Sequence, residues 1–217
     1  MHVLAGLLAY LVGSAPAAYF IGRAAGGVDI RRLGTGNMGA SNVARNVGKA
    51  WGALVFVLDV SKSAVPIVVI ERLSGDFALA TIWGLCCTAG HCWPAYFRFK
   101  GGKGIAVLGG FYIGVGIATG HPAYLIGMAA GYAAGMLAGN PGFASVVMIV
   151  ASPFLAWVDG NPVALVAGSA AGLPVILARR AQVLIDAWGL SANKAALVWS
   201  VVIEDKLPGQ ALVGLRS

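Results

Sequence analysis

The chain has 217 residues, of which 59% are hydrophobic and only 11% are charged. Soluble domains carry about 25% charged residues, so this composition excludes an ordinary soluble enzyme and indicates an integral membrane protein. The formal net charge of +7 does not indicate nucleic-acid binding, because the basic residues lie between apolar segments rather than on a soluble face.

Seven successive segments are apolar and close to the length of about 20 residues that crosses the bilayer core. They cover residues 2–22, 51–71, 77–96, 104–120, 122–139, 142–158 and 161–178. The segments are uniformly apolar rather than alternating, which favours helices over a transmembrane β-barrel. The sequence therefore predicts an all-α integral membrane protein built as a seven-transmembrane-helix bundle.

The first segment, residues 2–22, is predicted to be one helix that is retained in the protein. A cleavable signal peptide has a positively charged region before its apolar run, but no lysine or arginine precedes this segment. Ala15-Pro16-Ala17 has the small residues of a cleavage site, but the apolar run continues to Ile21. We therefore expect a continuous first transmembrane helix.

Basic residues gather in the loops that share one side of this bundle. Five lie in the 23–50 loop, three in the 97–103 loop and five from Arg179 onward, which makes thirteen of the fifteen. Positive charge stays on the cytoplasmic side of membranes. The count therefore predicts a seven-span bundle with its N-terminus outside and its C-terminus in the cytoplasm.

The chain is predicted to divide into a membrane domain, residues 1–182, and a cytoplasmic tail, residues 183–217. Residues 195–203 are apolar but too short to span, so we expect a helix that lies in the membrane interface. The sequence leaves the role of the tail and the oligomeric state open.

One charged pair falls inside the second apolar segment. Lys62 follows Asp59 by three residues, so both side chains lie on one helix face and can pair. Charges within a span are costly and are usually paired or functional. Two interpretations remain: a buried ion pair that orients helices, or a polar floor beneath a ligand site.

The three cysteines, Cys86, Cys87 and Cys92, all fall in the third segment. An odd, clustered set is a poor disulfide framework. His91 precedes Cys92, but no second cluster completes a zinc site. We expect packing cysteines, no metal and no cofactor.

Two glycine-rich polar loops on the predicted cytoplasmic side suggest a site for an anion. The first polar loop is residues 34–45, and it carries Thr35, Asn37, Ser41, Asn42 and Arg45. The second polar loop is residues 97–104, and it carries Lys100, Lys103 and the glycines Gly101, Gly102 and Gly104. Glycine N–H groups can enclose a phosphate, and lysine adds charge. Taken singly, each loop is also explained as a tight turn.

His91 and Ser145 lie at the same predicted side, near the ends of their segments. Each has a plain alternative, because a lone histidine is often structural and a lone serine often packs. No serine–histidine–acid arrangement is evident in the sequence. A site without a base can still transfer a group when the donor is activated, as in an acyl phosphate, whose leaving phosphate takes the proton. The protein then supplies positioning and charge stabilisation.

These motifs, in this order, resemble the bacterial acyl-phosphate:glycerol-3-phosphate acyltransferase family, commonly called PlsY. The matching stretches are Gly13-Ser14, GTGNMGASNVAR at 34–45, DVSKS at 59–63, GHCWPAYFRFKGGKG at 90–104 and Ala144-Ser145. The resemblance covers residues 5–182. It implies a seven-span enzyme of the bacterial cell membrane with a cytoplasmic active site. Such an enzyme makes lysophosphatidic acid from glycerol 3-phosphate and acyl phosphate and releases inorganic phosphate.

The resemblance also implies roles for individual residues. The residues expected to act in catalysis, or to hold glycerol 3-phosphate and the transferring centre, are Thr35, Arg45, Lys103 and Ser145. The residues expected to bind substrate or shape its pocket are Asn37, Gly39, Ser41, Asn42, His91, Gly101, Gly102, Gly104 and Gln182. Within that set, the residues from Asn37 to Asn42 are expected to cradle the acyl phosphate. Membrane lipid is the other expected partner.

The sequence departs from the family pattern at several positions. Thr35 replaces a serine and Ser41 a threonine, so both keep the hydroxyl, whereas Ser63 replaces a glycine and Val107 a threonine. Asn140 stands where a basic residue is common, and Arg180 and Gln182 are partial matches near the end of the last segment. Two alternatives to an acyltransferase therefore remain. One is a phosphate or phospholipid transporter, which would favour internal repeats that are not found here, and the other is an inactive PlsY-like protein.

Overall fold

The computed structural model describes residues 1–137, 141–189 and 193–202. Within these ranges the protein is all helical, with ten α-helices and two short 3-10 segments. The elements are α1 (His2–Gly13), α2 (Ala17–Gly26), η1 (Ile30–Arg32), α3 (Ala40–Asn46), α4 (Lys49–Ser74), α5 (Phe77–Cys92), η2 (Ala95–Phe97), α6 (Ile105–Thr119), α7 (Pro122–Leu137), α8 (Pro141–Val158), α9 (Val163–Trp188) and α10 (Lys194–Val202).

Three helical stretches are long and apolar enough to cross a membrane, namely His2–Gly26, Lys49–Ser74 and Val163–Trp188. Ile105–Thr119 and Ala144–Val158 are shorter apolar helices. Large apolar side chains such as Phe56, Phe154 and Trp157 are exposed on the outside of the bundle. In an integral membrane protein these outward side chains face lipid rather than water.

The first transmembrane segment is interrupted, so the prediction of one continuous helix over residues 2–22 is wrong. α1 ends at Gly13 and α2 begins at Ala17, with Pro16 between them. Proline has no N–H to donate and disfavours helical backbone in the residue before it. Lys62 Nζ donates to the freed carbonyl of Ala15, and Ser14 Oγ accepts from the N–H of Ala95 at 3.3 Å.

Glycines let α1 and α5 approach each other closely. A Cβ on Gly13 would lie 2.1 Å from the carbonyl oxygen of Cys87, and one on Gly90 would lie 2.1 Å from that of Tyr10. Close approach through small residues is a common way to pack helices in lipid. This contact fixes the start of the chain against the helix that leads into the second polar loop.

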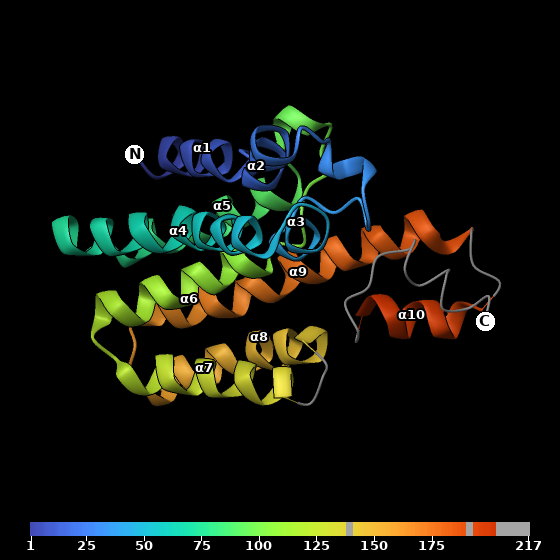
Figure 1. Cartoon of the computed structure of the whole chain (residues 1–217). Helices are drawn as coiled ribbons and strands as arrows, with labels where there is room; N and C mark the ends of the chain where they lie inside the picture. The colour runs from blue at the N-terminus through green and yellow to red at the C-terminus, as the bar shows by residue number, and fades with distance from the viewer. Residues whose placement is uncertain (138–140, 190–192, 203–217) are drawn as a thin grey trace.

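The main core lies between α6 and its neighbours α4 and α9. Leu108, Phe111 and Val115 of α6 are fully buried, together with Ile67 of α4 and Leu165 of α9. In Figure 1, α7 and α8 lie side by side on the far side of α6 and α9 from α1. The arrangement carries the polar ends of several helices to one end of the bundle.

The helix of the seventh predicted segment, α9, continues ten residues beyond the predicted end at residue 178, because it runs to Trp188. The two arginines at 179 and 180 ended the apolar run in the sequence, but both are buried against polar partners. The predicted domain boundary at residue 182 therefore lies inside α9, and the division into domains remains a prediction.

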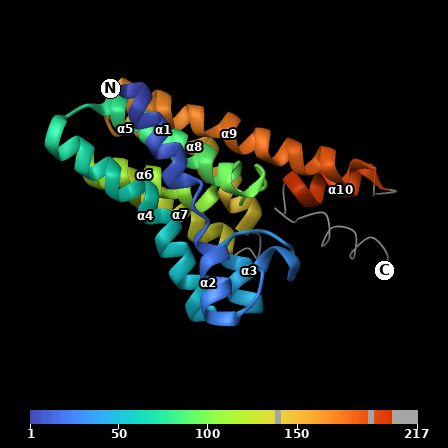
Figure 2. The ribbon, with the colours of Figure 1, turned by 90° about the horizontal axis from the view of Figure 1, so that it is seen from above.

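The helix predicted at 195–203 is confirmed as α10, Lys194–Val202. Its buried residues Leu197 and Val201 pack against Val183 and Ala187 of α9. Figures 1 and 2 both show α10 beside the C-terminal part of α9. Its location at a membrane interface remains a prediction.

Candidate active site

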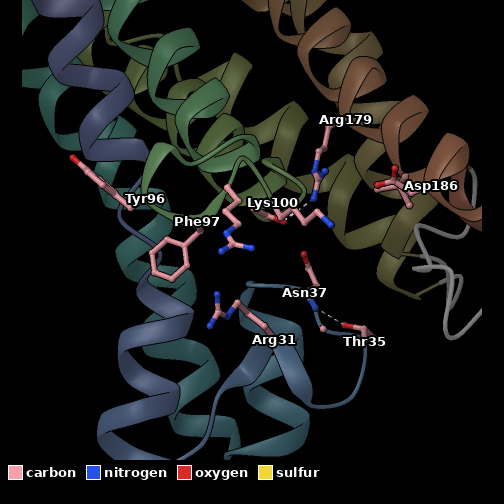
Figure 3. A pocket seen from close by; sticks show the side chains of 12 residues that line it. Arg31, Thr35, Asn37, Tyr96, Phe97, Lys100, Arg179 and Asp186 are labelled. Carbon is pink, nitrogen blue, oxygen red and sulfur yellow. Dashed lines mark hydrogen bonds between the residues drawn. The ribbon is translucent and has the colours of Figure 1, made fainter.

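A cavity of about 510 Å³ opens where the two polar loops meet the C-terminal part of α9. Figure 3 shows Arg31, Lys100 and Arg179 around this space, with Asn37 directed toward Lys100. Its lining residues are Arg31, Thr35, Gly36, Asn37, Tyr96, Phe97, Arg98, Lys100, Gly101, Arg179, Val183 and Asp186. Four of them are basic and one is acidic, so the cavity is suited to an anion.

The first polar loop is organised from within by Asn42, which is 1% exposed. Its amide nitrogen donates to the carbonyls of Ile30, Leu33 and Asn37 at 3.0–3.1 Å. Its amide oxygen accepts the N–H of Thr35 at 3.2 Å. The Asn42 side chain, which was predicted to bind phosphate, therefore uses its hydrogen-bonding groups on the backbone of the loop. These bonds place Thr35 and Asn37 on the cavity wall.

Arg31 enters the cavity from η1 with its charge already paired. Its Nη2 lies 2.6 Å from Asp29 Oδ2, and its guanidinium lies over the rings of Tyr19 and Phe97 at 5.0 and 5.4 Å. The hydrogen bond from Arg31 holds the pKa of Asp29 well below its usual range. Asp29 therefore stays ionised and offsets one cation.

Arg98 and Lys100 supply the remaining exposed cations of the cavity wall. Neither has an ion-pair partner within the part of the chain that the structure describes. Arg98 and Phe99 both have positive φ, at 53° and 59°, which is uncommon for residues with side chains. Such backbone is often found at functional sites, and the loop carries these cations at the mouth of the cavity.

The second polar loop uses its glycines for close packing. The N–H groups of Gly101 and Gly102 donate to the carbonyls of Cys92 and His91 at 3.2 and 3.1 Å. A Cβ on Gly101 would lie 2.0 Å from the oxygen of His91, and one on Gly102 would lie 2.1 Å from the Nε2 of the same residue. The expectation that these two N–H groups enclose an anion is therefore wrong. Gly104, at φ 80°, caps α6.

Arg179 of α9 holds the same loop from the opposite side. Its Nε and Nη2 donate to the carbonyls of Gly102 and Gly101 at 3.1 and 2.8 Å. Its Nη1 donates to Gln182 Oε1 at 2.8 Å, and Trp93 Nε1 donates to that same oxygen at 2.7 Å. Arg179 is not among the residues predicted for the site, because its charge marks the end of the apolar run in the sequence, whereas in the structure it lies inside α9, where an ionisable residue within an apolar helix indicates function.

The pair predicted between Asp59 and Lys62 is confirmed, at 2.8 Å. His91 lies behind it, with its Nδ1 3.7 Å from Asp59 Oδ1 and its other ring nitrogen against Gly102. The pair therefore links the break after α1, through Lys62 and Ala15, to the back of the second polar loop. Both interpretations of the pair fit this arrangement.

Ser145 of α8 accepts a hydrogen bond from Arg180 Nη2 at 3.3 Å, and both side chains are buried. Lys103 is half-buried, whereas Ser41 and Arg45 are exposed on α3, which Gly39 precedes as the N-cap. None of these side chains lines the cavity. Of the predicted residues, the structure therefore brings together Thr35, Asn37 and Gly101 on one wall.

The departures from the family pattern differ in their surroundings. Val107 is fully buried beside Ala9 and Cys87, so an apolar side chain suits its position. Asn140 lies outside the described residues. Cys87 and Cys92 are buried free thiols. Within the described ranges, no group of three or more His, Cys, Asp or Glu side chains could hold a metal.

A helical membrane bundle with a cationic, hydroxyl- and amide-lined cavity at one end is an integral membrane protein suited to a phosphorylated substrate. The family model for glycerol-3-phosphate acyltransferase matches residues 3–188. The chain is 35% identical over 183 residues to the glycerol-3-phosphate acyltransferase of Rubrobacter xylanophilus. This alignment covers 84% of this chain and 89% of that protein. The chain belongs to the glycerol-3-phosphate acyltransferase family.

Solved structures of PlsY, an integral membrane glycerol 3-phosphate acyltransferase, have the same fold. The glycerol 3-phosphate form matches with a TM-score of 0.71 and 31% identity, over 83% of this chain and 88% of that one. The lysophosphatidic acid form matches with a TM-score of 0.71 and 30% identity, over 82% and 87%. The predicted class, a membrane acyltransferase of phospholipid synthesis, is confirmed, and the transporter and the inactive protein are set aside.

Proposed function

We propose that this acyltransferase uses an acyl phosphate as its donor and releases inorganic phosphate as it forms lysophosphatidic acid. A hydroxyl oxygen of glycerol 3-phosphate attacks the acyl carbonyl carbon, the bond from that carbon to the phosphate oxygen breaks, and the leaving phosphate takes the hydroxyl proton. The observation that carries this proposal is the cationic cavity, because both substrates bear phosphate and the reaction needs no separate base.

The two polar loops divide the work in this proposal. Thr35 and Asn37 donate to phosphate oxygens at the cavity wall, and Arg98 and Lys100 attract the anions to its mouth. Lys103 does not itself line the cavity but lies two residues beyond Gly101, which does, and we assign to it the stabilisation of the charge on the phosphate as it leaves. Asn42, Gly101, Gly102 and Gln182 act by shaping the backbone around the site.

Residues at other points of the same end of the bundle complete the assignment. Ser145, held by Arg180 between α8 and α9, and Arg45 and Ser41 on α3 form further polar contacts for glycerol 3-phosphate. His91 supports the second polar loop from behind.

We propose that the bundle crosses the membrane seven times, with the N-terminus outside and the active site in the cytoplasm. The support is the placement of charge. Figure 1 shows α3, the C-terminal part of α9 and α10 at one end of the bundle, and the N-terminus at the other. Arg31, Arg98, Lys100 and Arg179 all lie at the first end. Reporter fusions in the 97–103 loop and after Arg72 should report opposite sides.

One assay tests the donor. Purified protein in lipid vesicles receives palmitoyl phosphate and glycerol 3-phosphate, and lysophosphatidic acid and inorganic phosphate are followed together. We expect the two products in equal amounts and no turnover with palmitoyl-CoA. Equal or faster turnover with palmitoyl-CoA would overturn the proposal, because a thioester leaving group is no phosphate base.

A further inference from the structure

Arg179 is a buried charged side chain that donates hydrogen bonds to the backbone of the second polar loop. It is 9% exposed, and its guanidinium donates to two successive backbone carbonyls, those of Gly101 and Gly102. A planar guanidinium can hold two acceptors at a fixed spacing, which a lysine cannot do. The residue after these glycines is Lys103, to which the proposed mechanism assigns charge stabilisation.

The two glycines are held from both sides. Their N–H groups donate to the carbonyls of His91 and Cys92, at the end of α5, and their own carbonyls accept from Arg179 of α9. Contact with His91 also prevents the loop from moving closer to α5. Removing the guanidinium frees the carbonyl side of the loop and lets it move away from α5.

The guanidinium is itself oriented by the side chain of Gln182. Gln182, one turn further along α9, accepts from Arg179 Nη1 at 2.8 Å and from the indole of Trp93 at 2.7 Å. Trp93 directly follows α5, so the amide joins the two helices that grip the loop. The arrangement fixes which way the guanidinium faces.

We infer that Arg179 is a positioning residue that sets the place of the Lys103 ammonium through the backbone of Gly101 and Gly102. The inference depends on the proposed function, in which Lys103 acts on the leaving phosphate. The rival role for Arg179 is direct contact with a substrate phosphate, since its side chain also lines the cavity. The two roles differ in how the loss of Arg179 combines with the loss of Lys103.

A double-mutant cycle separates them, with Arg179→Ala, Lys103→Ala and the double variant in vesicles with palmitoyl phosphate and glycerol 3-phosphate. If Arg179 acts through Lys103, its removal lowers kcat at least about tenfold in the wild-type background and less than about twofold in the Lys103→Ala background. Equal fold losses in both backgrounds would overturn the inference in favour of direct contact or a general loss of structure.

A second readout does not depend on turnover. Amide hydrogen exchange at Gly101 and Gly102 should be faster in Arg179→Ala than in wild type, and unchanged in Lys103→Ala. Unchanged exchange in Arg179→Ala would also overturn the inference. Arg179→Lys keeps one charged donor but loses the planar guanidinium that holds two carbonyls at once. It should fall between Arg179→Ala and wild type in both measurements. If Arg179→Ala does not fold, Arg179→Lys takes its place in the cycle, with the same requirement of non-additivity.

Two controls separate this inference from the proposed function. Arg72→Gln removes an arginine from the far end of α4, and we expect wild-type kcat and exchange. A wild-type protein that makes no lysophosphatidic acid from palmitoyl phosphate contradicts the proposed function. An active wild type with additive losses contradicts the role of Arg179 alone.

Discussion

The two polar loops meet at one cavity but are held in opposite ways. The first polar loop is organised by Asn42, whose partners all lie within twelve residues of it along the chain. The second polar loop is held on one side by the end of α5 and on the other by Arg179, 77 and 78 residues from its two acceptors. The first loop is therefore a local structure, and the second exists only when the bundle is assembled.

The largest effect is expected where the second polar loop meets α5. Gly101→Ala places a Cβ 2.0 Å from the His91 carbonyl oxygen, so the loop must move and lose its hydrogen bond to Cys92. A displacement of about 1 Å near a reacting centre can cost about 100-fold in rate, and we expect at least that loss of kcat/KM.

The matched control is Gly109→Ala in α6, where a Cβ meets no heavy atom within 4 Å. Alanine is a better helix former than glycine, so this variant should insert and turn over like wild type. Activity and thermal stability measured side by side give the comparison. A fully active Gly101→Ala would show that the loop is less tightly held than its contacts imply.

A smaller but still large effect is expected from the local loop. Asn42→Ala leaves the carbonyls of Ile30, Leu33 and Asn37 without their donor, at a cost of about 2–4 kcal/mol in unfolding free energy. We expect kcat/KM to fall roughly 30-fold, because Thr35 and Asn37 lose their places.

Asn46→Ala is the control for this change. The Asn46 side chain is exposed and donates to the backbone and side-chain oxygens of Asn42, both at 2.9 Å. Its loss should cost less than about 1 kcal/mol. Equal losses in the two variants, by denaturation and by turnover, would contradict the central role of Asn42.

The next effect separates the two lysines of the second polar loop. Lys103→Ala should insert normally and lose at least about tenfold in kcat/KM, because a charged hydrogen bond to phosphate contributes about 1.5–3 kcal/mol. Lys100→Ala should lose about threefold at most, through KM, because an exposed charge is screened by solvent. Near-wild-type kinetics in Lys103→Ala would leave the second polar loop as a basic turn.

The difference between the loops also explains how far the sequence could be interpreted. The helices, the Asp59–Lys62 pair and the polar loops follow from apolar runs, helical spacing and local composition, and the family follows from the motifs. The grip of Arg179 on Gly101 and Gly102 could not be predicted, because it joins segments far apart in the chain. The glycine N–H groups were assigned to an anion because their partners on α5 cannot be seen in the loop itself.

Two helix boundaries were missed for the same reason. An apolar run suggested that the helix continues through Pro16, and two arginines suggested that the last helix ends before Arg179. In the structure, Lys62 satisfies the carbonyl freed at Ala15, and Ser145 partners Arg180. Tertiary partners thus decide where a helix breaks and where it continues, and single-sequence patterns do not contain them.

The smallest effect concerns the ion pair beside the first polar loop. The hydrogen bond from Arg31 lowers the pKa of Asp29 from its ordinary value of 3.8. A carboxyl with a depressed folded-state pKa contributes stability above the unfolded pKa, and that contribution is lost only as the pH falls through the folded pKa. Asp29 should therefore remain ionised throughout pH 5–8.

Asp29→Asn tests this local pair. It removes a charge that does not titrate between pH 5 and 8, so its pH–rate profile should run parallel to that of wild type. KM for glycerol 3-phosphate should change about twofold or less, because Asp29 does not line the cavity, Arg31 keeps its contacts with Tyr19 and Phe97, and the Arg31 end of the pair is 42% exposed and screened by solvent. Asp29→Glu, which keeps the charge, is the control. An acidic limb in this range that disappears in Asp29→Asn but persists in Asp29→Glu would mean that the carboxyl titrates near neutral pH. The structure of the first polar loop would then depend on pH. The two loops would differ in their response to protonation as well as in how far along the chain their stabilising partners lie.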